Sequence, residues 1–477
     1  MKYLLILPGV LVLLVLIAVV RTLVSPRKTP GYQPPQTDEA EALRLAGKLS
    51  KMIQVDTTSH AGGDDPARFR AFHKTLAELF PRVFSQLEKT EIDGNLLFYW
   101  KGRSREKPIL LMSHQDVVPA EGAWSHAPFS GDIADGKVWG RGASDTKCSV
   151  MAFFEAAEQL LAEGYTPPTD VYLASSCTEE WAGDGAPKLV AELQRRGVEL
   201  FLVCDEGGAI ISEPIGGIPG NFAMVGVFEK GKADVKFTAK STGGHASAPG
   251  RHTPIARLAA FVTEVETHSP FKKKLLPEVA AMFRTLAPYA SSFSLRLLLG
   301  NLWLFAPLLK LVLPAVSAQA GAMLRTTIAF TTQSGSDAYN VIPQEATLGA
   351  NMRFIPHQGE QESLAIIQTL AEKHGLSTEV LHANDFTPPV DIHGEAFTLF
   401  THVIGETFPG LAASPYVMTG ATDAQFYQPI CKSCIRFAPV IYGPEQMRGM
   451  HGLNENIEYR CLPGAVRFYQ NLIRAEK

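Results

Sequence analysis

Acidic and imidazole side chains recur directly after short apolar runs of this chain. His114 and Asp116 follow the run 108–113, and Asp145 ends the glycine-rich stretch 139–145. The same pattern recurs further along, and a second histidine lies in the last quarter. The side chains concerned are His114, Asp116, Asp145, Glu179, Glu180, Asp205 and His451. Carboxylates and imidazoles bind zinc and carry protons, so the pattern indicates metal-assisted or acid–base chemistry.

The placement of these groups matters more than any one of them. In open α/β sheets, ligands bind beyond the carboxyl ends of the strands. Several acids meeting there repel one another unless a cation neutralises them. Two histidines with several carboxylates suit zinc, and a shared carboxylate can bridge two ions ~3.5–4 Å apart. Each motif alone also fits a surface loop or a solvated helix start, but together they predict a metal site.

The elements that must position these side chains have the pattern of an α/β sheet. The runs 108–113, 170–176 and 200–204 are short and apolar, as buried parallel strands are. Residues 149–161 carry apolar side chains at helical spacing. The sequence therefore predicts a mostly parallel sheet with helices on both faces.

A second unit interrupts this pattern. Residues 234–241 alternate apolar and polar side chains, as a half-exposed strand does. Beyond it the sequence predicts a helix, two strands, a helix and a strand, at 255–265, 326–332, 347–354, 361–374 and 378–381. This β-α-β-β-α-β order is that of a ferredoxin-like α+β unit. We therefore expect an inserted lid domain at 229–386, between catalytic parts at 39–228 and 387–477.

Two strongly apolar segments stand apart from this layout. Residues 1–23 are almost continuously apolar and predict a transmembrane anchor, with a cleaved signal peptide as the alternative. A proline-rich linker at 24–38 is expected to be extended. The stretch 295–316 fits helical packing against the sheet of the insert, or else a lining for an acyl chain or a membrane-facing surface. Pro307 and Lys310 argue against a second membrane span.

Composition and cysteine usage exclude other classes. The chain has 477 residues, of which 46% are hydrophobic, and its net charge of −4 gives no basis for nucleic-acid binding. Six cysteines are too few for a disulfide scaffold. Cys431 and Cys434 form a C-x-x-C pair, but no second pair or nearby histidine completes a zinc site, which favours coincidence. Cys148, Cys177 and Cys204 are expected in the sheet core.

The motifs in this order resemble the family of co-catalytic di-zinc peptidases that includes glutamate carboxypeptidase, aminoacylase and the Gly-Xaa carboxypeptidases. The resemblance spans 39–472 and is strongest for the membrane-anchored or secreted branch that acts on Gly-Xaa dipeptides and N-fatty-acyl amino acids. The matching segments are 113–119, 139–145, 179–180, 204–208, 243–247, 340–343 and the late histidine. The family has the fold expected above, including the inserted lid.

The resemblance implies a set of metal ligands. His114, Asp145 and Asp205 would hold one Zn²⁺, and Glu180 and His451 the other, with Asp145 bridging the two ions. Two zinc ions per subunit are therefore expected, with Co²⁺ as an alternative metal.

The resemblance also implies residues that act on the substrate. Asp116 would orient the first histidine ligand, and Glu179 would serve as the general base. In the family, the residue matching His245 polarises the substrate carbonyl, often from a partner subunit. Asn340 and Arg353 would bind the substrate carboxylate, a task that suits the guanidinium fork.

Three functions are weighed on this basis. The first is a zinc carboxypeptidase that cleaves small Gly-Xaa peptides with a free C-terminal carboxylate. The second is an N-fatty-acyl amino acid hydrolase or synthase, which the apolar stretch 295–316 motivates. The third, a non-catalytic binding protein, would lack metal ligands, and none is missing. We also expect a membrane-anchored, non-cytoplasmic catalytic part, with a secreted or periplasmic protein as the alternative, and a homodimer through the lid.

Overall fold

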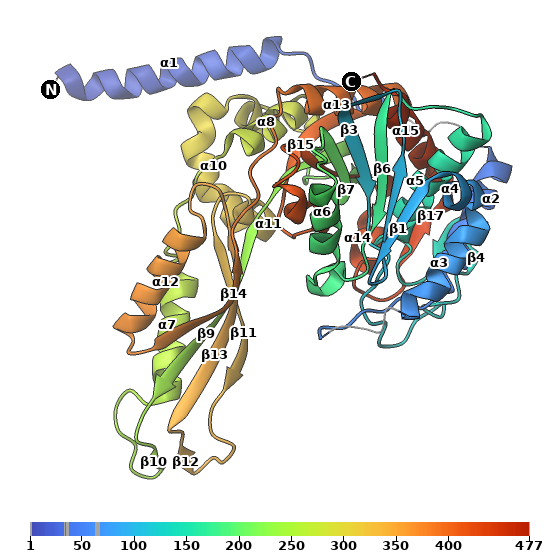
Figure 1. Ribbon diagram of the computed structural model, residues 1–477. Coiled ribbons are helices and arrows are strands. Elements are labelled where there is room, and N and C mark those ends of the chain that lie inside the picture. The colour runs from blue at the N-terminus through green and yellow to red at the C-terminus, as the bar shows by residue number, and fades with distance from the viewer. Residues whose placement is uncertain (1, 33, 35–37, 63–66, 477) are drawn as a thin grey trace.

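The computed structural model describes residues 2–32, 34, 38–62 and 67–476 (Figure 1). A large mixed sheet forms the catalytic part, and a smaller sheet projects from it. In spatial order the large sheet comprises β1 (Glu88–Ile92), β2 (Asn95–Trp100), β6 (Thr169–Ser175), β3 (Ser104–Met112), β7 (Leu202–Ser212), β16 (Cys434–Tyr442), β8 (Asn221–Glu229) and β15 (Ala412–Met418). Strands β6, β3, β7 and β16 run parallel, so the predicted α/β class is confirmed.

Helices cover both faces of the large sheet because its central strands are apolar on both sides. In β3, Ile109 and Leu111 face one core, whereas Leu110 and Met112 face another. The helices on the first face are α2 (Glu39–Ile53), α5 (Lys147–Ala162), α13 (Glu395–Thr407) and α15 (Leu462–Arg474). The opposite face is covered by α6 (Gly185–Arg195) and the short helix η3 (Asp423–Tyr427).

Smaller elements frame the carboxyl edge of the sheet. Three short strands, β17, β5 and β4, form a separate sheet there. These elements are α3 (Ala67–Leu79), α4 (Pro81–Gln86), β4 (Ile133–Ala134), β5 (Lys137–Trp139), η1 (Glu179–Trp181), α14 (Pro444–Gly449), β17 (Asn456–Glu458) and η4 (Tyr459–Cys461).

The projecting unit is a four-stranded antiparallel sheet. Its spatial order is β11 (Thr327–Ser334), β13 (Glu345–Phe354), β9 (Gly231–Lys240) and β14 (Ser377–Asn384). Helices α7 (Pro254–Thr267) and α12 (Glu360–Lys373) cover one face and share a core with the strands. The short strands β10 (Gly244–His245) and β12 (Val341–Ile342) pair at the far tip (Figure 1). This is the strand order of the ferredoxin-like unit.

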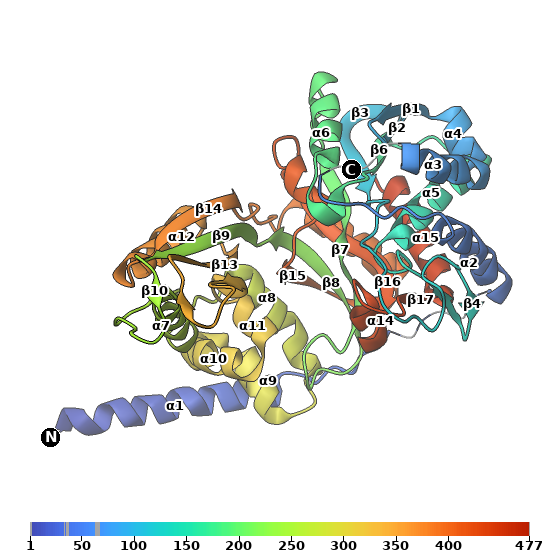
Figure 2. The ribbon, with the colours of Figure 1, turned by 90° about the horizontal axis from the view of Figure 1, so that it is seen from below.

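The helical stretch between α7 and β11 belongs by packing to the catalytic part. It contains α8 (Pro277–Leu286), η2 (Ala287–Tyr289), α9 (Phe293–Gly300), α10 (Leu302–Val316) and α11 (Ala318–Ala322). Buried side chains of α8, α9 and α10 join the core of the large sheet and not that of the lid, and Figure 2 shows α8 alongside β15. The prediction that 295–316 packs against the sheet of the insert is therefore wrong.

The N-terminal segment forms helix α1 (Lys2–Val24), which lies beside α9 and α10. Among the described residues, no single helix has the length and hydropathy needed to cross a membrane; α9 with Leu302–Ala315 meets those criteria only as a pair bent by 108°. The described residues between α1 and α2 form no helix or strand, and the Lys28 amide donates to the Pro288 carbonyl at 2.9 Å. Residues 33 and 35–37 of the predicted linker lie outside the described residues.

Because α8 to α11 pack with the catalytic part, the chain crosses between the two parts four times, and two of these crossings lie side by side. At one, β8 ends at Glu229 and β9 begins at Gly231; at the other, the Thr387 amide donates to the Glu229 carbonyl at 3.1 Å. A Cβ at Gly231 would collide with the Asn384 carbonyl, so the close approach of the crossings requires glycine. Arg436 Nε donates to Glu229 Oε1 at 2.7 Å, and both side chains are fully buried.

This buried ion pair gives a stability prediction. Glu229→Met leaves the Arg436 charge buried without a partner, so the free energy of unfolding should fall by about 3–5 kcal/mol, as urea denaturation would measure. The double variant Glu229→Met/Arg436→Met should lose less than the single variant. As a control, Glu362→Met breaks an exposed ion pair with Lys272 and should change stability by less than ~1 kcal/mol. Equal losses for Glu229→Met and this control would contradict the prediction.

Candidate metal centre

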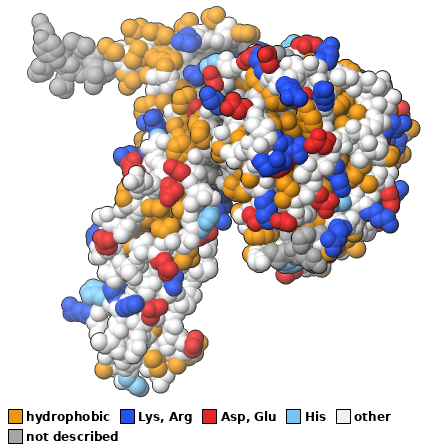
Figure 3. All heavy atoms as spheres, viewed as in Figure 1, with side chains coloured by type: hydrophobic (Ala, Val, Ile, Leu, Met, Phe, Trp, Pro, Cys, Tyr) orange, Lys and Arg blue, Asp and Glu red, His pale blue; other side chains and the backbone are white. Residues whose placement is uncertain are grey.

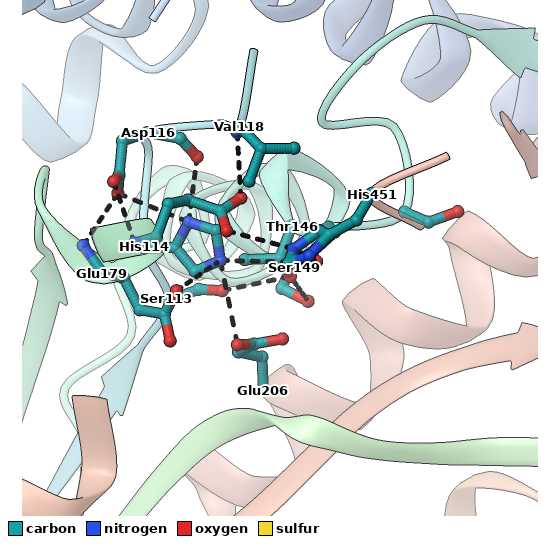
Figure 4. A network of polar contacts seen from close by, with 12 residues as sticks. Ser113, His114, Asp116, Val118, Thr146, Ser149, Glu179, Glu206 and His451 are labelled. Atoms are coloured by element: carbon teal, nitrogen blue, oxygen red, sulfur yellow. Dashed lines mark hydrogen bonds and ion pairs between the residues drawn. The ribbon is translucent and has the colours of Figure 1, made fainter. Parts of the chain in front are cut away.

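Two histidines face the two oxygens of one carboxylate at the carboxyl edge of the large sheet. His114 follows β3, and its Nε2 lies 3.1 Å from Oδ1 of Asp145, just before α5. His451 follows α14, and its Nε2 lies 3.1 Å from Oδ2 of Asp145 (Figure 4). The structure thus brings together residues 337 positions apart (451 − 114 = 337). Asp145 has the position of a carboxylate that bridges two cations.

Each histidine is accompanied by a further carboxylate. Oε2 of Glu180 lies 3.1 Å from Nε2 of His451. On the other side, Oε1 of Glu206 and Oε2 of Glu179 lie 3.8 Å and 3.9 Å from Nε2 of His114. Figure 4 shows the carboxylates of Glu179 and Glu206 beside His114. His114, Asp145 and Glu180, and likewise His114, Glu179 and Glu206, each offer ligand atoms within 4.8 Å of one another.

Asp205 does not join either group, although the sequence analysis assigned it as a ligand. Its Oδ2 accepts the amide of Ala424 at 2.9 Å, and its Oδ1 accepts the amide of Glu206 at 2.8 Å. Adjacent residues of a strand point to opposite faces, so only one member of the Asp205–Glu206 pair can face the centre. The structure points to Glu206 as the ligand in place of Asp205, and Asp205 anchors the start of η3.

The carboxylate of Asp116 holds the turn of Glu179 and Glu180 in place more than it holds the ring of His114. Nδ1 of His114 lies 2.9 Å from the backbone carbonyl of Asp116 and 3.5 Å from its Oδ1. The carboxylate accepts the amides of Glu179 and Glu180 at 3.3 Å and 3.2 Å and the Ser59 hydroxyl at 2.6 Å. The predicted orienting role is thus fulfilled mainly by the carbonyl, while the carboxylate fixes both acids of η1.

Glu455 fixes the loop that carries Asp145, and the sequence analysis did not select it. Its Oε1 accepts the amides of Ser144 and Asp145 at 2.8 Å and 2.9 Å, and its Oε2 accepts Nη1 of Arg141 at 2.7 Å. Glu455 is fully buried and lies four positions after His451, so one loop supplies both a ligand and the support of another. His451 itself has a left-handed backbone with a φ of 53°, which is uncommon outside glycine and is enriched at functional sites.

The centre concentrates negative charge where water is scarce. Burial raises the pKa of Glu179 and of Glu206 well above the ordinary value, and burial followed by the charge of Asp145 raises the pKa of Glu180. Burial and then the charge of Asp205 raise the pKa of Asp423, beneath the centre, to about 8. A bound cation removes this penalty because it supplies the missing positive charge.

The donor set fits a tetrahedral N/O metal site. Ligand atoms ~2.1 Å from a tetrahedral ion lie about 3.4 Å apart, which agrees with the 3.1–3.8 Å separations around His114 and His451. His114, Asp145 and Glu206 would hold one ion, and Asp145, Glu180 and His451 the other. None of the six free cysteines contributes: Cys148, Cys177 and Cys204 are buried in the core, as expected.

The three predicted substrate-binding residues lie in the lid and do not converge. His245 and Asn340 are exposed at the tip, where the Ala246 amide donates to the Asn340 carbonyl at 2.9 Å. Arg353 lies at the opposite end of β13, near the chain crossing at Gly231, and its Nε donates to Asn351 Oδ1. At ~3.3 Å per residue, the ten residues of β13 span about 30 Å. Within one chain, Asn340 and Arg353 therefore cannot bind the same carboxylate.

An α/β sheet with an acidic, histidine-bearing metal centre at its carboxyl edge and an inserted lid defines a metal-dependent hydrolase. Comparison with known proteins agrees: residues 110–475 match the sequence profile of Peptidase family M20/M25/M40, and the chain belongs to this family. It is a hydrolase of that family.

Known relatives match almost the whole chain. An N-fatty-acyl-amino acid synthase/hydrolase of Xenopus tropicalis is 33% identical over 97% of this chain and 93% of its own. A probable carboxypeptidase S-like protein of Dictyostelium discoideum is 31% identical over 98% and 92%. Among solved structures, an M20 metallo-carboxypeptidase of Sulfolobus solfataricus (TM-score 0.67, 17% identity) covers 90% of this chain and 98% of its own. Human carnosine dipeptidase 1 (0.64, 15%) covers 91% and 96%.

The choice between Asp205 and Glu206 can be tested by metal analysis. Glu206→Gln should lose roughly half of the bound metal, that is one ion of a pair, because it removes a ligand. Asp205→Asn should keep its metal but lower the free energy of unfolding by about 1–3 kcal/mol, since it weakens a buried hydrogen-bond acceptor. Elemental analysis after dialysis and urea denaturation supply the two measurements. Loss of metal in Asp205→Asn alone would reverse the assignment.

Proposed function

We propose that the protein is a zinc-dependent amidohydrolase that releases an amino acid with a free carboxylate from an N-fatty-acyl amino acid. The near full-length similarity to the Xenopus tropicalis synthase/hydrolase supports this reading. The metal is proposed to be zinc because the ligands are two imidazoles with carboxylates. A metal pair bound there would polarise the substrate carbonyl and acidify a water molecule.

Glu179 is proposed as the general base because it lies beside the proposed metal ligands but is not itself one of them. Its Oε2 is 3.9 Å from Nε2 of His114, and its backbone is fixed by Asp116. Burial raises the pKa of Glu179, which makes this carboxylate ready to accept a proton. Glu179 would take a proton from the attacking water and donate it to the leaving nitrogen of the amide.

A cavity lined by residues on both sides of Glu179 in the chain, Thr178 and Trp181, is the observation that favours a long acyl group. It has a volume of about 770 Å³ and extends from Cys177 and Thr178 toward the lid. Phe69, Trp181 and Phe426 line it. Aromatic side chains give an acyl chain apolar contact without demanding hydrogen bonds, and cavities of this size accommodate drug-sized ligands.

A carboxypeptidase that cleaves Gly-Xaa peptides is the second candidate. The Dictyostelium discoideum relative named as carboxypeptidase S-like supports it. Asp93 and Asp184 at the same cavity could accept the free amino group of a dipeptide, although each already pairs with Lys188, at 2.7 Å and 3.0 Å. Either substrate carries the same free carboxylate, and an N-acyl amino acid could also form in the reverse, condensing direction.

A homodimer through the lid is proposed to complete the carboxylate site. Since Asn340 and Arg353 of one chain lie at opposite ends of β13, a second copy would have to supply His245 and Asn340 to the centre beside Arg353. The exposure of His245 and Asn340 at the lid tip supports this arrangement.

The proposed base can be removed without removing a bridging ligand. Glu179→Gln should reduce turnover by about 10²–10⁴-fold and leave the metal content unchanged, because the amide cannot accept the proton. Turnover of N-oleoyl-phenylalanine and elemental analysis measure both effects. Glu121→Gln, an exposed glutamate outside the centre, is the matched control and should behave as the unchanged protein. A Glu179→Gln enzyme with full activity would refute the assignment of the base.

A substrate panel separates the two candidate functions. N-oleoyl-phenylalanine should be hydrolysed, and Trp181→Ala should lower kcat/KM for it about tenfold (~1.4 kcal/mol) relative to N-acetyl-phenylalanine, since only the long chain reaches Trp181. N-acetyl-phenylalanine therefore serves as the internal control. Turnover of Gly-phenylalanine without turnover of the oleoyl compound would replace the first candidate with the second.

A further inference from the structure

Helices α1, α9 and α10 carry one continuous apolar surface, which we call the apolar face. Its exposed side chains on α9 and α10 are Phe293, Trp303, Leu308, Leu311 and Val312. Those on the described part of α1 are Val10, Leu11, Val12, Leu13, Leu16, Ile17, Val20, Leu23 and Val24. Figure 3 shows hydrophobic side chains running from α1 onto the helices beside it.

Polar side chains at the contact of α1 with α9 and α10 are paired with one another or with the backbone. The buried Asn301 donates from Nδ2 to Thr22 Oγ1 at 2.9 Å. Nη2 of Arg296 donates to the carbonyls of Thr22 and Ser25, both at 2.9 Å, so it satisfies carbonyls at the C-terminus of α1. These bonds pair the polar atoms at the interface, so α1 is docked specifically on α9 and α10. The exposed side chains of its described part are apolar except near its C-terminus, where Arg21 is exposed.

The chain after α1 is also held to the catalytic part. The Lys28 amide donates to the Pro288 carbonyl, and Lys28 Nζ lies 5.9 Å from the centroid of the Tyr289 ring. Tyr32 is 8% exposed and meets Phe408 edge-on, with ring centroids 6.1 Å apart. The orientation of α1 relative to the metal centre is therefore fixed by packing.

The segments that carry the apolar face contain charged side chains of one sign only. Residues 1–37 and 279–336 contain no Asp or Glu. Their charged side chains are Lys2, Arg21, Arg27, Lys28, Arg284, Arg296, Lys310 and Arg325. The chain as a whole has a net charge of −4, so this segregation is local. Basic side chains beside apolar helices match an anionic lipid surface, because long cationic side chains extend to the headgroups.

We propose that α1, α9 and α10 together embed in one leaflet of an anionic membrane and hold the catalytic part in a fixed orientation to it. A helix with apolar side chains on nearly every side is covered by protein core or by lipid, and α1 packs on α9 and α10 while most apolar side chains of its described part stay exposed. The bend of 108° between α9 and α10 suits helices lying in the interface. Trp303 Nε1 donates to Asn301 Oδ1 at 3.3 Å, an amphipathic placement typical of interfacial tryptophan.

Trp303 provides a direct probe. The full-length protein is reconstituted with vesicles of phosphatidylcholine and phosphatidylglycerol in equal amounts, with or without bromine on the acyl chains, which quenches tryptophan in contact with lipid. The brominated lipid should lower the emission, and Trp303→Phe should lose most of that decrease. Trp124→Phe, in the catalytic part, should retain it. Equal quenching of the unchanged protein and Trp303→Phe would overturn the proposal.

A second set of variants identifies the occupant of the apolar face. Leu308→Gln/Leu311→Gln/Val312→Gln should abolish quenching of Trp303, whereas the matched lid variant Ile255→Gln/Val380→Gln/Leu381→Gln, at residues of similar exposure, should not. Turnover of N-acetyl-phenylalanine in both variants reports that the catalytic part is folded.

Other occupants give different outcomes, and each would overturn the proposal. An unquenched Trp303 together with a smaller assembly in the α10 variant would assign the apolar face to a second copy of the chain. If Trp303 is not quenched and the α10 variant loses kcat/KM for N-oleoyl-phenylalanine alone, the apolar face would be assigned to the acyl chain of the substrate. The membrane readout does not depend on turnover, so failure of the proposed function leaves this test intact.

Discussion

The mutual repulsion of buried carboxylates governs the structure around the centre. Asp145, Glu179, Glu180 and Glu206 lie within reach of two histidines, and no lysine or arginine pairs with any of the four in the part of the chain that the structure describes. Gathering such groups out of water is unfavourable unless an opposite charge is present. The centre is therefore built for cations, and the remaining contacts of this region serve to hold the acids in place against their repulsion.

The holding contacts are mainly backbone amides that donate to buried acids. Asp116 binds the turn of Glu179 and Glu180, Glu455 binds the loop of Asp145, and Asp205 binds the start of η3. Hydrogen bonds to a charged acceptor are among the stronger ones, and a fixed acceptor positions a loop without adding a competing ligand. Acids that do not bind metal thus position those that do, in the way that outer groups orient ligands in other metal sites.

The sequence was sufficient for the fold class because buried strands are short apolar runs. Polar groups that directly follow such strands meet at the carboxyl edge, a rule that applies to His114 and Glu180. Asp145 and His451 do not directly follow a strand, so their expected roles as ligands rested on the family resemblance. The sequence could not separate Asp205 from Glu206, because that choice depends on the backbone of β7, whose pairing with β16 is irregular between Asp205 and Ala209. Gly208, within this irregular stretch, lies so close to the carbonyls of Met224 and Arg436 that a Cβ would collide with them.

The sequence also could not predict which part of the protein the helical stretch 277–322 packs against, because its apolar side chains could join either hydrophobic core. These side chains pack in the core of the large sheet, so α1 and α8 to α11 form one body with the metal centre. The lid sheet is joined to that body at Glu229 and Thr387 and at the two ends of the stretch 277–322. Lys230 reinforces one crossing by donating from Nζ to the carbonyls of Ala322 and Arg325. A rotation of the lid about these crossings would change the distance of Arg353 from the centre but leave the apolar face fixed relative to it. The two bodies therefore differ in what they carry: one holds the proposed metal ligands and the apolar face, and the other holds the residues proposed to bind the substrate carboxylate.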